Sequence, residues 1–221
     1  MDPKSILDRM RAVLGKDDLT ALKEISSNDP SDPFRVLIGT ILSHRTRDEK
    51  TAAATARLFH RFKGAKELSG ARSSEVVELI RGVGFYRVKS KRIIQVARII
   101  TEQYGGNVPD TVKELMKLPS VGRKTANCVM VYGFDMDAIP VDTHVHRIAN
   151  RLGIVNASTP EGTEKGLVEF FPKEEWKEVN DLFVSYGKKV CKPIGPKCGG
   201  CILREDCAYY KKLAKTGKVN A

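Results

Sequence analysis

The chain has 221 residues, of which 38 are Lys or Arg and 27 are Asp or Glu, so its formal net charge is +11. Hydrophobic residues make up 41% of the sequence, which is too many for a disordered chain. No apolar run approaches the roughly 20 residues that a membrane-spanning helix needs. The N-terminal sequence MDPKSILDRM has no hydrophobic signal region. We therefore expect a cytoplasmic protein, and its basic excess favours a polyanionic partner.

Helix signals occur along the whole chain. Asp2-Pro3 is an N-cap residue followed by a first-turn proline, and Asp32-Pro33 and Thr159-Pro160 repeat this device. Apolar residues at helical spacing follow Asp32-Pro33 and predict a buried helix. No run alternates apolar and polar residues as a strand would, so the predicted fold class is all-α. Further helices are predicted at residues 48–62, 74–81, 86–104, 111–118, 123–134, 143–152, 161–171 and 174–190.

A short motif occurs twice, each time between two predicted helices. The first copy is Ile80-Arg81-Gly82-Val83-Gly84, and the second, 38 residues later, is Leu118-Pro119-Ser120-Val121-Gly122. In both copies an apolar residue is followed by two other residues, by Val-Gly and then by a basic helix start. Two helix–hairpin–helix units in tandem would build one helical domain. The alternative is that any two turns between helices look this similar.

The second copy has the features of a phosphate-binding hairpin. Pro119 ends the preceding helix, Val121 is expected to plug the gap between the two helices, and Gly122 is expected to take a positive φ. The helix that begins near Arg123 points its first N–H groups out of the hairpin. Such a helix start binds a phosphate without reading the base sequence.

Lys124 follows in the first turn of that helix. An unprotonated amine can attack the C1′ carbon of a nucleotide sugar and form a Schiff base. A helix N-terminus, the neighbouring Arg123 and partial desolvation all disfavour the ammonium form. The alternative is one more phosphate-binding lysine, and the hairpin alone favours that alternative.

Asp142 lies in the segment Val141-Asp142-Thr143-His144, just before a predicted helix. It has the position of an N-cap residue. The functional alternative is a carboxylate that stabilises positive charge on the sugar as the base leaves, or that moves a proton to or from Lys124. His144 and His146 are two residues apart and point to different helix faces, so we expect packing, polar or phosphate contacts rather than a metal pair.

Four of the five cysteines, Cys191, Cys198, Cys201 and Cys207, fall within 17 residues, whereas Cys128 stands alone in an apolar stretch. In a cytosolic chain this clustering predicts metal ligation rather than disulfides. Four thiolates suit either zinc or an iron–sulfur cluster, and the spacing alone does not separate the two. The loop between the first two cysteines has lysines at both ends, which can present cations to a phosphate.

Together these motifs resemble the endonuclease III family of DNA repair glycosylases, in the helix–hairpin–helix superfamily. The resemblance covers most of the chain, and the lysine hairpin, the aspartate 18 residues after Lys124 and the cysteine spacing carry it most specifically. The family's [4Fe–4S] loop has this cysteine spacing. The matching segments are Ile41–Ser43 with Thr46 and Asp48, Gly84–Tyr86 with Lys89, Leu118–Asn127, Val141–His144 with Arg147, and the four clustered cysteines.

The resemblance implies two helical domains with a DNA cleft between them. Residues 25–137 would form a helical barrel with its hairpin at 118–123, and residues 1–24 with 138–221 would form the domain that carries a [4Fe–4S] cluster on the loop 191–207. The enzyme would be a monomeric, bifunctional glycosylase and abasic-site (AP) lyase acting on damaged double-stranded DNA. Lys124 would be the nucleophile and Asp142 its essential carboxylate. The base would be flipped out, and β-elimination would cut the strand 3′ to the lesion. The preferred lesions would be oxidised or ring-saturated pyrimidines.

Some positions depart from the family pattern. Ser120 replaces the first hairpin glycine, so its backbone is expected to avoid a strongly positive φ. Arg45, preceded by His44, stands where the family often has glutamine, in a loop that reaches into the duplex, and it can hydrogen-bond a guanine. Phe85 has the position of an apolar wedge, with a core aromatic as the alternative. The residues expected to contact DNA are Ser43, Arg45, Phe85, Val121, Gly122, Arg123, His144 and Lys192.

Two other functions compete with this one. A monofunctional mismatch glycosylase of the same superfamily would lack the nucleophilic lysine, so Lys124 argues against it. A non-catalytic DNA-binding module with a zinc loop would give Lys124 and Asp142 no joint task. The basic excess is concentrated in two segments, residues 81–101 with six basic and no acidic residues, and residues 191–221 with seven basic and two acidic residues.

Overall fold

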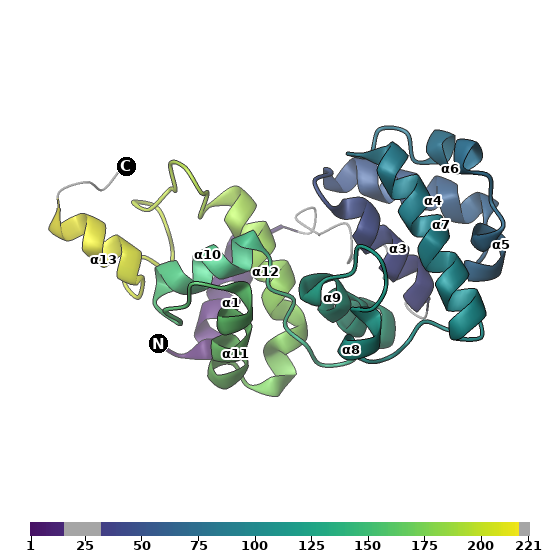
Figure 1. The fold of residues 1–221 in the computed structure, drawn as a ribbon. Helices are drawn as coiled ribbons and strands as arrows, with labels where there is room; N and C mark the ends of the chain where they lie inside the picture. Colours follow the sequence, from purple (N-terminus) through teal and green to yellow (C-terminus); the bar gives the residue numbers. More distant parts are fainter. Residues whose placement is uncertain (16–31, 217–221) are drawn as a thin grey trace. The chain divides into compact units, whose positions relative to one another are not determined.

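The computed structural model describes residues 1–15 and 32–216, and these residues form helices and loops without a strand. The all-α prediction is therefore confirmed. The chain divides into two compact units, which Figure 1 colours along the sequence. A discontinuous unit combines the N-terminal helix with the residues from Ile139 onward, and a continuous unit ends at Ala138. The domain boundary expected near residue 25 lies outside the described residues.

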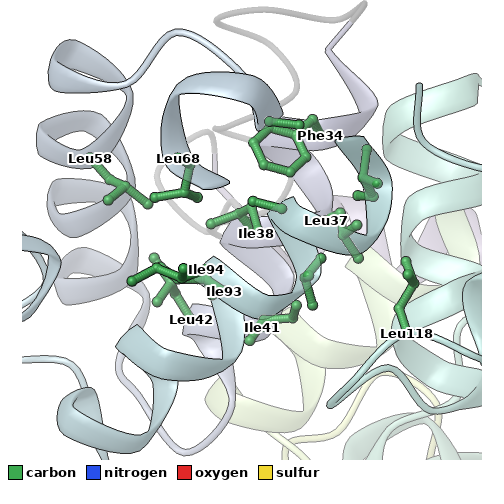
Figure 2. Packing of buried hydrophobic residues seen from close by; sticks show 14 of the residues in the cluster. Phe34, Leu37, Ile38, Ile41, Leu42, Leu58, Leu68, Ile93, Ile94 and Leu118 are labelled. Carbon is green, nitrogen blue, oxygen red and sulfur yellow. The ribbon is translucent and has the colours of Figure 1, made fainter. Parts of the chain in front are cut away.

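The continuous unit is built around one buried helix, α3. Every residue from Val36 to Leu42 in it is buried, and it packs against α4, α7 and α9. Figure 2 shows Ile38, Ile41 and Leu42 of this helix among leucine and isoleucine side chains of its neighbours. The helices of this unit are α3 (Pro33–Ser43), α4 (Asp48–Arg61), α5 (Ala65–Ser69), α6 (Ser73–Leu79), α7 (Tyr86–Gln103), α8 (Val112–Leu115) and α9 (Arg123–Phe134).

The discontinuous unit has its own core, to which the N-terminal helix contributes Ile6, Leu7 and Met10. This helix packs against α12, and α12 packs against α10. Leu203, from the cysteine loop, is completely buried in the same core, so the loop is anchored to the helices. The helices are α1 (Pro3–Val13), α10 (Thr143–Leu152), α11 (Pro160–Phe170), the 3-10 helix η1 (Lys173–Glu175), α12 (Trp176–Lys189) and α13 (Ala208–Lys215).

The predicted N-caps are confirmed. Side-chain oxygens of Asp2, Asp32 and Thr159 accept hydrogen bonds from backbone N–H groups three residues later, at 2.7, 2.9 and 3.1 Å. The predicted bounds of α9 and α10 agree with the structure. The helix predicted at 111–118 is limited to Val112–Leu115, and α5 and α13 were not predicted. Among the described helices, none has the length and apolarity that crossing a membrane requires.

The two copies of the repeated motif have the same turn. The N–H of Val83 donates to the carbonyl of Ile80 at 3.1 Å, and the N–H of Val121 donates to the carbonyl of Leu118 at 3.2 Å. Both valines are buried, so Val121 is a plug as predicted, and Val83 has the same role in the first hairpin. The two motifs are therefore structurally equivalent hairpins, one between α6 and α7 and the other between α8 and α9.

The backbone of the second hairpin corrects two expectations. Ser120 has a φ of 67°, whereas Gly122 has a φ of −96°. The reason is the turn itself, because a four-residue turn closed by a bond from its last N–H to its first carbonyl often needs a positive φ at its third residue. Ser120 is that third residue, and Gly82 has the same place in the first hairpin with a φ of 98°.

Candidate active site and cysteine loop

Lys124 is the second residue of α9, directly after the second hairpin. The N-cap of this helix is Gly122, which has no side chain to bond the first N–H groups. A Cβ atom added to Gly122 would have no neighbour within 4 Å, so the backbone is open to a ligand there. Lys124 is partly buried, whereas the next residues, Thr125 and Ala126, are buried and hold the helix in the core.

His44 lies beside the start of α9. Its Nε2 is 3.1 Å from the Oγ1 of Thr125, and the imidazole also interacts electrostatically with Lys124 and Lys89. Burial, reinforced by these two cations, lowers the pKa of His44 from 6.5 to about 4. The imidazole is therefore neutral at physiological pH. Sequence reasoning gave His44 no role, because its partner Thr125 is 81 residues away.

Lys89 braces the end of α3 from inside the continuous unit. Its Nζ donates to the carbonyl oxygens of Leu42 at 2.7 Å and His44 at 2.5 Å, and to the Oγ1 of Thr46 at 3.2 Å. A cation at a helix C-terminus also stabilises the helix dipole. Burial lowers the pKa of Lys89 to about 8. This lysine is a structural clamp on the loop that contains Arg45.

Arg45 and Phe85 form a pair on the surface of the continuous unit. The guanidinium carbon of Arg45 lies 5.8 Å from the centre of the Phe85 ring. Phe85 is 61% exposed, so the core alternative for this residue is wrong. Both residues have a positive φ, 53° for Arg45 and 57° for Phe85, which is costly for residues with a Cβ atom.

Gly84 allows the loop that contains Arg45 and the first hairpin, which precedes Phe85, to approach each other closely. A Cβ atom at Gly84 would collide with the carbonyl oxygen of Arg45, and the N–H of Gly84 donates to the Oγ1 of Thr46 at 3.1 Å. The loop after α3 and the first hairpin are thus held in direct contact. Sequence reasoning placed Arg45 and Phe85 on separate DNA-contacting segments, and the structure brings the two together.

Two of the expected DNA contacts have other tasks in the unbound protein. The Oγ of Ser43 donates to the carbonyl of Thr40 at 2.8 Å, which ends α3 locally. Val121 is only 7% exposed and belongs to the core, so its side chain is a plug. Gly122 and Arg123 are both exposed.

Asp142, in the discontinuous unit, is the N-cap of α10. Its Oδ1 accepts from the backbone N–H of His144 at 2.8 Å and of Val145 at 2.9 Å. The N-cap interpretation is therefore correct. Both bonds use the same oxygen, and within the described residues Oδ2 has no hydrogen-bond partner. The cap orients the carboxylate and leaves one oxygen for a second task.

The two histidines of α10 make different contacts. The Nδ1 of His144 is 3.2 Å from a guanidinium nitrogen of Arg147, and the Nδ1 of His146 is 2.6 Å from the Oγ1 of Thr163. His146 is a packing residue between α10 and α11. His144 lies next to an arginine that also donates to the carbonyl of Cys191 at 2.8 Å, so it adjoins the cysteine loop.

The four clustered cysteines line one pocket, together with residues of α10 and α12. All four are free thiols, which is inconsistent with the disulfide alternative. No three His, Cys, Asp or Glu side chains among the described residues are arranged to hold a metal ion. Lys192 is exposed at the beginning of the loop.

Arg151 and Tyr186 are pocket residues that sequence reasoning missed. Arg151 donates to the Sγ of Cys191 at 3.4 Å and to the carbonyls of Lys192 and Pro193 at 2.7 and 3.0 Å. The hydroxyl of Tyr186 lies 3.0 Å from the Sγ of Cys201, and burial raises the pKa of this tyrosine. The only sequence signal was helical spacing, which puts Arg151 one turn after Arg147.

Comparisons with known proteins agree with this geometry. A model of the HhH-GPD superfamily of base excision DNA repair proteins matches residues 38–173. Endonuclease III of Thermotoga maritima is 48% identical over 185 residues, which are 84% of this chain and 87% of that protein. A solved structure of a trapped covalent endonuclease III–DNA intermediate matches with a TM-score of 0.77 and 34% identity, over 88% of this chain and 95% of that chain. The structure of a thermostable thymine-DNA glycosylase matches with a TM-score of 0.75 and 25% identity, over 87% of this chain and 94% of that chain. On this similarity, which extends over most of its length, the chain belongs to the endonuclease III family of the HhH-GPD superfamily.

Proposed function

We propose that this protein is a bifunctional DNA glycosylase and AP lyase of base excision repair, acting as a monomer in the cytoplasm on damaged double-stranded DNA. The observation that carries the proposal is the position of Lys124. It lies in the first turn of α9, partly buried, behind an open glycine hairpin and beside a neutral imidazole. A reactive amine placed at a phosphate-binding helix start can reach the sugar of a nucleotide that has been flipped out of the duplex.

The proposed reaction begins with attack of the unprotonated Lys124 Nζ on the sugar C1′ carbon. The C1′–N bond to the base breaks, and the base leaves with the electron pair of that bond and takes up a proton. The lysine nitrogen loses a proton and the sugar ring opens, so the C1′–O4′ bond breaks, O4′ takes up a proton and C1′ becomes a protonated imine. This imine makes the C2′ proton acidic, and loss of that proton breaks the C3′–O bond and expels the 3′ phosphate by β-elimination. The carboxylate of Asp142 would stabilise the positive charge that develops on the sugar, or move the proton of the lysine. Oxidised or ring-saturated pyrimidines are the proposed lesions.

The proposed DNA contacts in the continuous unit lie near both hairpins. The pair of Arg45 and Phe85 is exposed and has a strained backbone, and such strain is common at functional sites. We assign Phe85 as an apolar wedge between base pairs and Arg45 as the group that fills the gap left by the flipped base. The backbone of Gly122 and the charge of Arg123 would bind a phosphate.

In the discontinuous unit, the four cysteines of the pocket are proposed to bind a [4Fe–4S] cluster. The four cysteines line one pocket, which supports one shared ligand set, and in a [4Fe–4S] cluster each thiolate would bond its own iron. Arg151 and Tyr186 would donate hydrogen bonds to ligand sulfurs, while Lys192 and His144 would contact the DNA backbone.

A monofunctional mismatch glycosylase is the second candidate, because the chain also matches the structure of a thymine-DNA glycosylase and has Arg45 in the gap-filling loop. A trapping experiment with borohydride separates the two functions. Borohydride should reduce the imine and link the protein covalently to abasic DNA. Lys124→Ala should abolish this product, and Lys113→Ala, which changes an exposed lysine of α8, should leave it unchanged. Persistent trapping by the Lys124→Ala variant would remove this lysine as the nucleophile.

Asp142→Asn tests the carboxylate with its helix cap preserved, because asparagine caps a helix about as well as aspartate. We expect the variant to fold and to bind DNA like the wild type, but to turn over more slowly by at least about 10-fold, within the usual range for a proton-transferring group. An unchanged rate would exclude a catalytic role.

A panel of duplexes with defined lesions, with base release and strand cleavage resolved, would then define the substrate. Protein purified anaerobically should be brown, whereas a colourless protein containing zinc would support the non-catalytic zinc module.

A further inference from the structure

The residues Ser43 to Thr46, which we name the bridging loop, contact both hairpins of the continuous unit. Toward the first hairpin, Thr46 accepts from the N–H of Gly84, and Lys89 donates to the carbonyl of His44. Toward the second hairpin, the imidazole of His44 bonds the hydroxyl of Thr125. One short loop therefore connects the exposed Arg45 and Phe85 pair to the helix that carries Lys124.

His44 is well placed to transmit a displacement. Its backbone carbonyl is held by the buried Lys89, and its side chain is held by Thr125, which is 3% exposed. Thr125 directly follows Lys124 in α9, so a shift of the bridging loop that moves His44 acts on the first turn of that helix. Because the imidazole is neutral, it makes this connection without adding a third cation between Lys89 and Lys124.

A small displacement at this place has a large effect on rate. A misplacement of about 1 Å between reacting atoms can cost roughly 100-fold in rate, even when its cause is remote. We propose that His44 is a positioning residue that couples the bridging loop to Lys124, so that seating Arg45 and Phe85 on duplex DNA sets the attack geometry of the lysine. This inference rests on the proposed function of Lys124 as the nucleophile.

The test measures the single-turnover rate of borohydride trapping on abasic duplex DNA and, separately, the dissociation constant for that DNA. His44→Ala and Thr125→Val both remove the hydrogen bond. Each should slow trapping by about 10- to 100-fold, while the dissociation constant changes by less than about 3-fold. His44→Gln and Thr125→Ser keep a hydrogen-bonding group and should recover most of the rate. The double variant of His44→Ala and Thr125→Val should be no slower than the slower single variant, because both changes break one contact.

Single-stranded abasic DNA provides the readout that a merely structural role would not change. It has no duplex on which the bridging loop can be seated, so the wild type and His44→Ala should trap it at equal rates. A slower rate of His44→Ala on both substrates would overturn the coupling, as would unchanged rates on the duplex or additive losses in the double variant. If thermal unfolding reveals that His44→Ala does not fold, the pair Thr125→Val and Thr125→Ser decides the question in the same assay. Lys124→Ala keeps the two hypotheses apart, because trapping that survives it contradicts the proposed function, and full-rate trapping by His44→Ala contradicts only this inference.

Discussion

The two hairpins of the continuous unit have the same backbone turn but different surroundings. In each, a buried valine plugs the turn and the preceding residue has a positive φ. The first hairpin is closed by the protein itself, because the carbonyl of Arg45 lies against Gly84, whereas the second is open at Gly122. The equivalent positions are Gly82 and Ser120, Val83 and Val121, Gly84 and Gly122, Phe85 and Arg123, and Tyr86 and Lys124.

This difference teaches that the turn and its plug determine the shape of a hairpin, while the two residues after its last glycine, Gly84 or Gly122, determine its chemistry. In the first hairpin they are aromatic, and Phe85 projects from the surface. In the second they are an arginine and a lysine at an open helix start. The comparison can be tested by making the same substitution at equivalent positions.

The largest contrast is expected between Gly84→Ala and Gly122→Ala. At Gly84 the new methyl group would force the bridging loop away from the hairpin, and overpacking of this kind costs about 1–3 kcal/mol of unfolding free energy. At Gly122 the methyl group meets no protein atom, so stability should change by less than about 0.5 kcal/mol. DNA binding by Gly122→Ala should weaken, since the methyl group occupies the space where a phosphate would approach. Urea unfolding measures the stability of both variants, and DNA titration measures their binding. Equal stability losses at both glycines would contradict the description of the first hairpin as closed and the second as open.

A smaller contrast of opposite sign is expected at Gly82 and Ser120. Gly82→Ala places a Cβ atom at a φ of 98° and should destabilise the protein by about 1–2 kcal/mol. Ser120→Gly relieves the same kind of strain but makes the unfolded chain more flexible, so the net gain should be below about 1 kcal/mol. Thermal unfolding of the two variants provides the measurement. A loss of stability in Ser120→Gly would mean that the serine side chain contributes more than its strained backbone costs.

Local features of the fold were predictable from the sequence, whereas contacts between distant segments were not. The N-caps and the bounds of α9 and α10 follow from residue types within one or two turns. The predicted φ of Ser120 is wrong, because the turn hydrogen bond imposes a conformation that a serine does not prefer by itself. The contact between His44 and Thr125 joins residues 81 positions apart, and nothing in the local pattern indicates it.

In the cysteine loop, too, the local pattern was predictable from the sequence and the contacts with distant residues were not. The spacing of the cysteines predicted a shared ligand set, and the structure places all four in one pocket. The role of Tyr186 could not be predicted from the sequence, because a tyrosine in an amphipathic helix is most often a core residue. Its hydroxyl approaches the sulfur of Cys201 only through the packing of α12 against the loop.

The last prediction concerns the residue that connects the two hairpins. The pKa of His44 is about 4 in the folded protein and 6.5 in the unfolded chain. Between these two pH values the unfolded chain therefore binds a proton that the folded protein does not. Stability contributed by the neutral imidazole is complete above pH 6.5 and is lost as the pH falls toward 4. His44→Gln should therefore lose less stability than the wild type over this range, while His60→Gln, which changes an exposed histidine, should behave like the wild type. Urea unfolding at several pH values measures the slopes. Identical slopes for His44→Gln and the wild type would mean that His44 is protonated equally well in the folded and the unfolded protein, although Lys89 and Lys124 both face it. The bridging loop would then tolerate a third cation between the two hairpins.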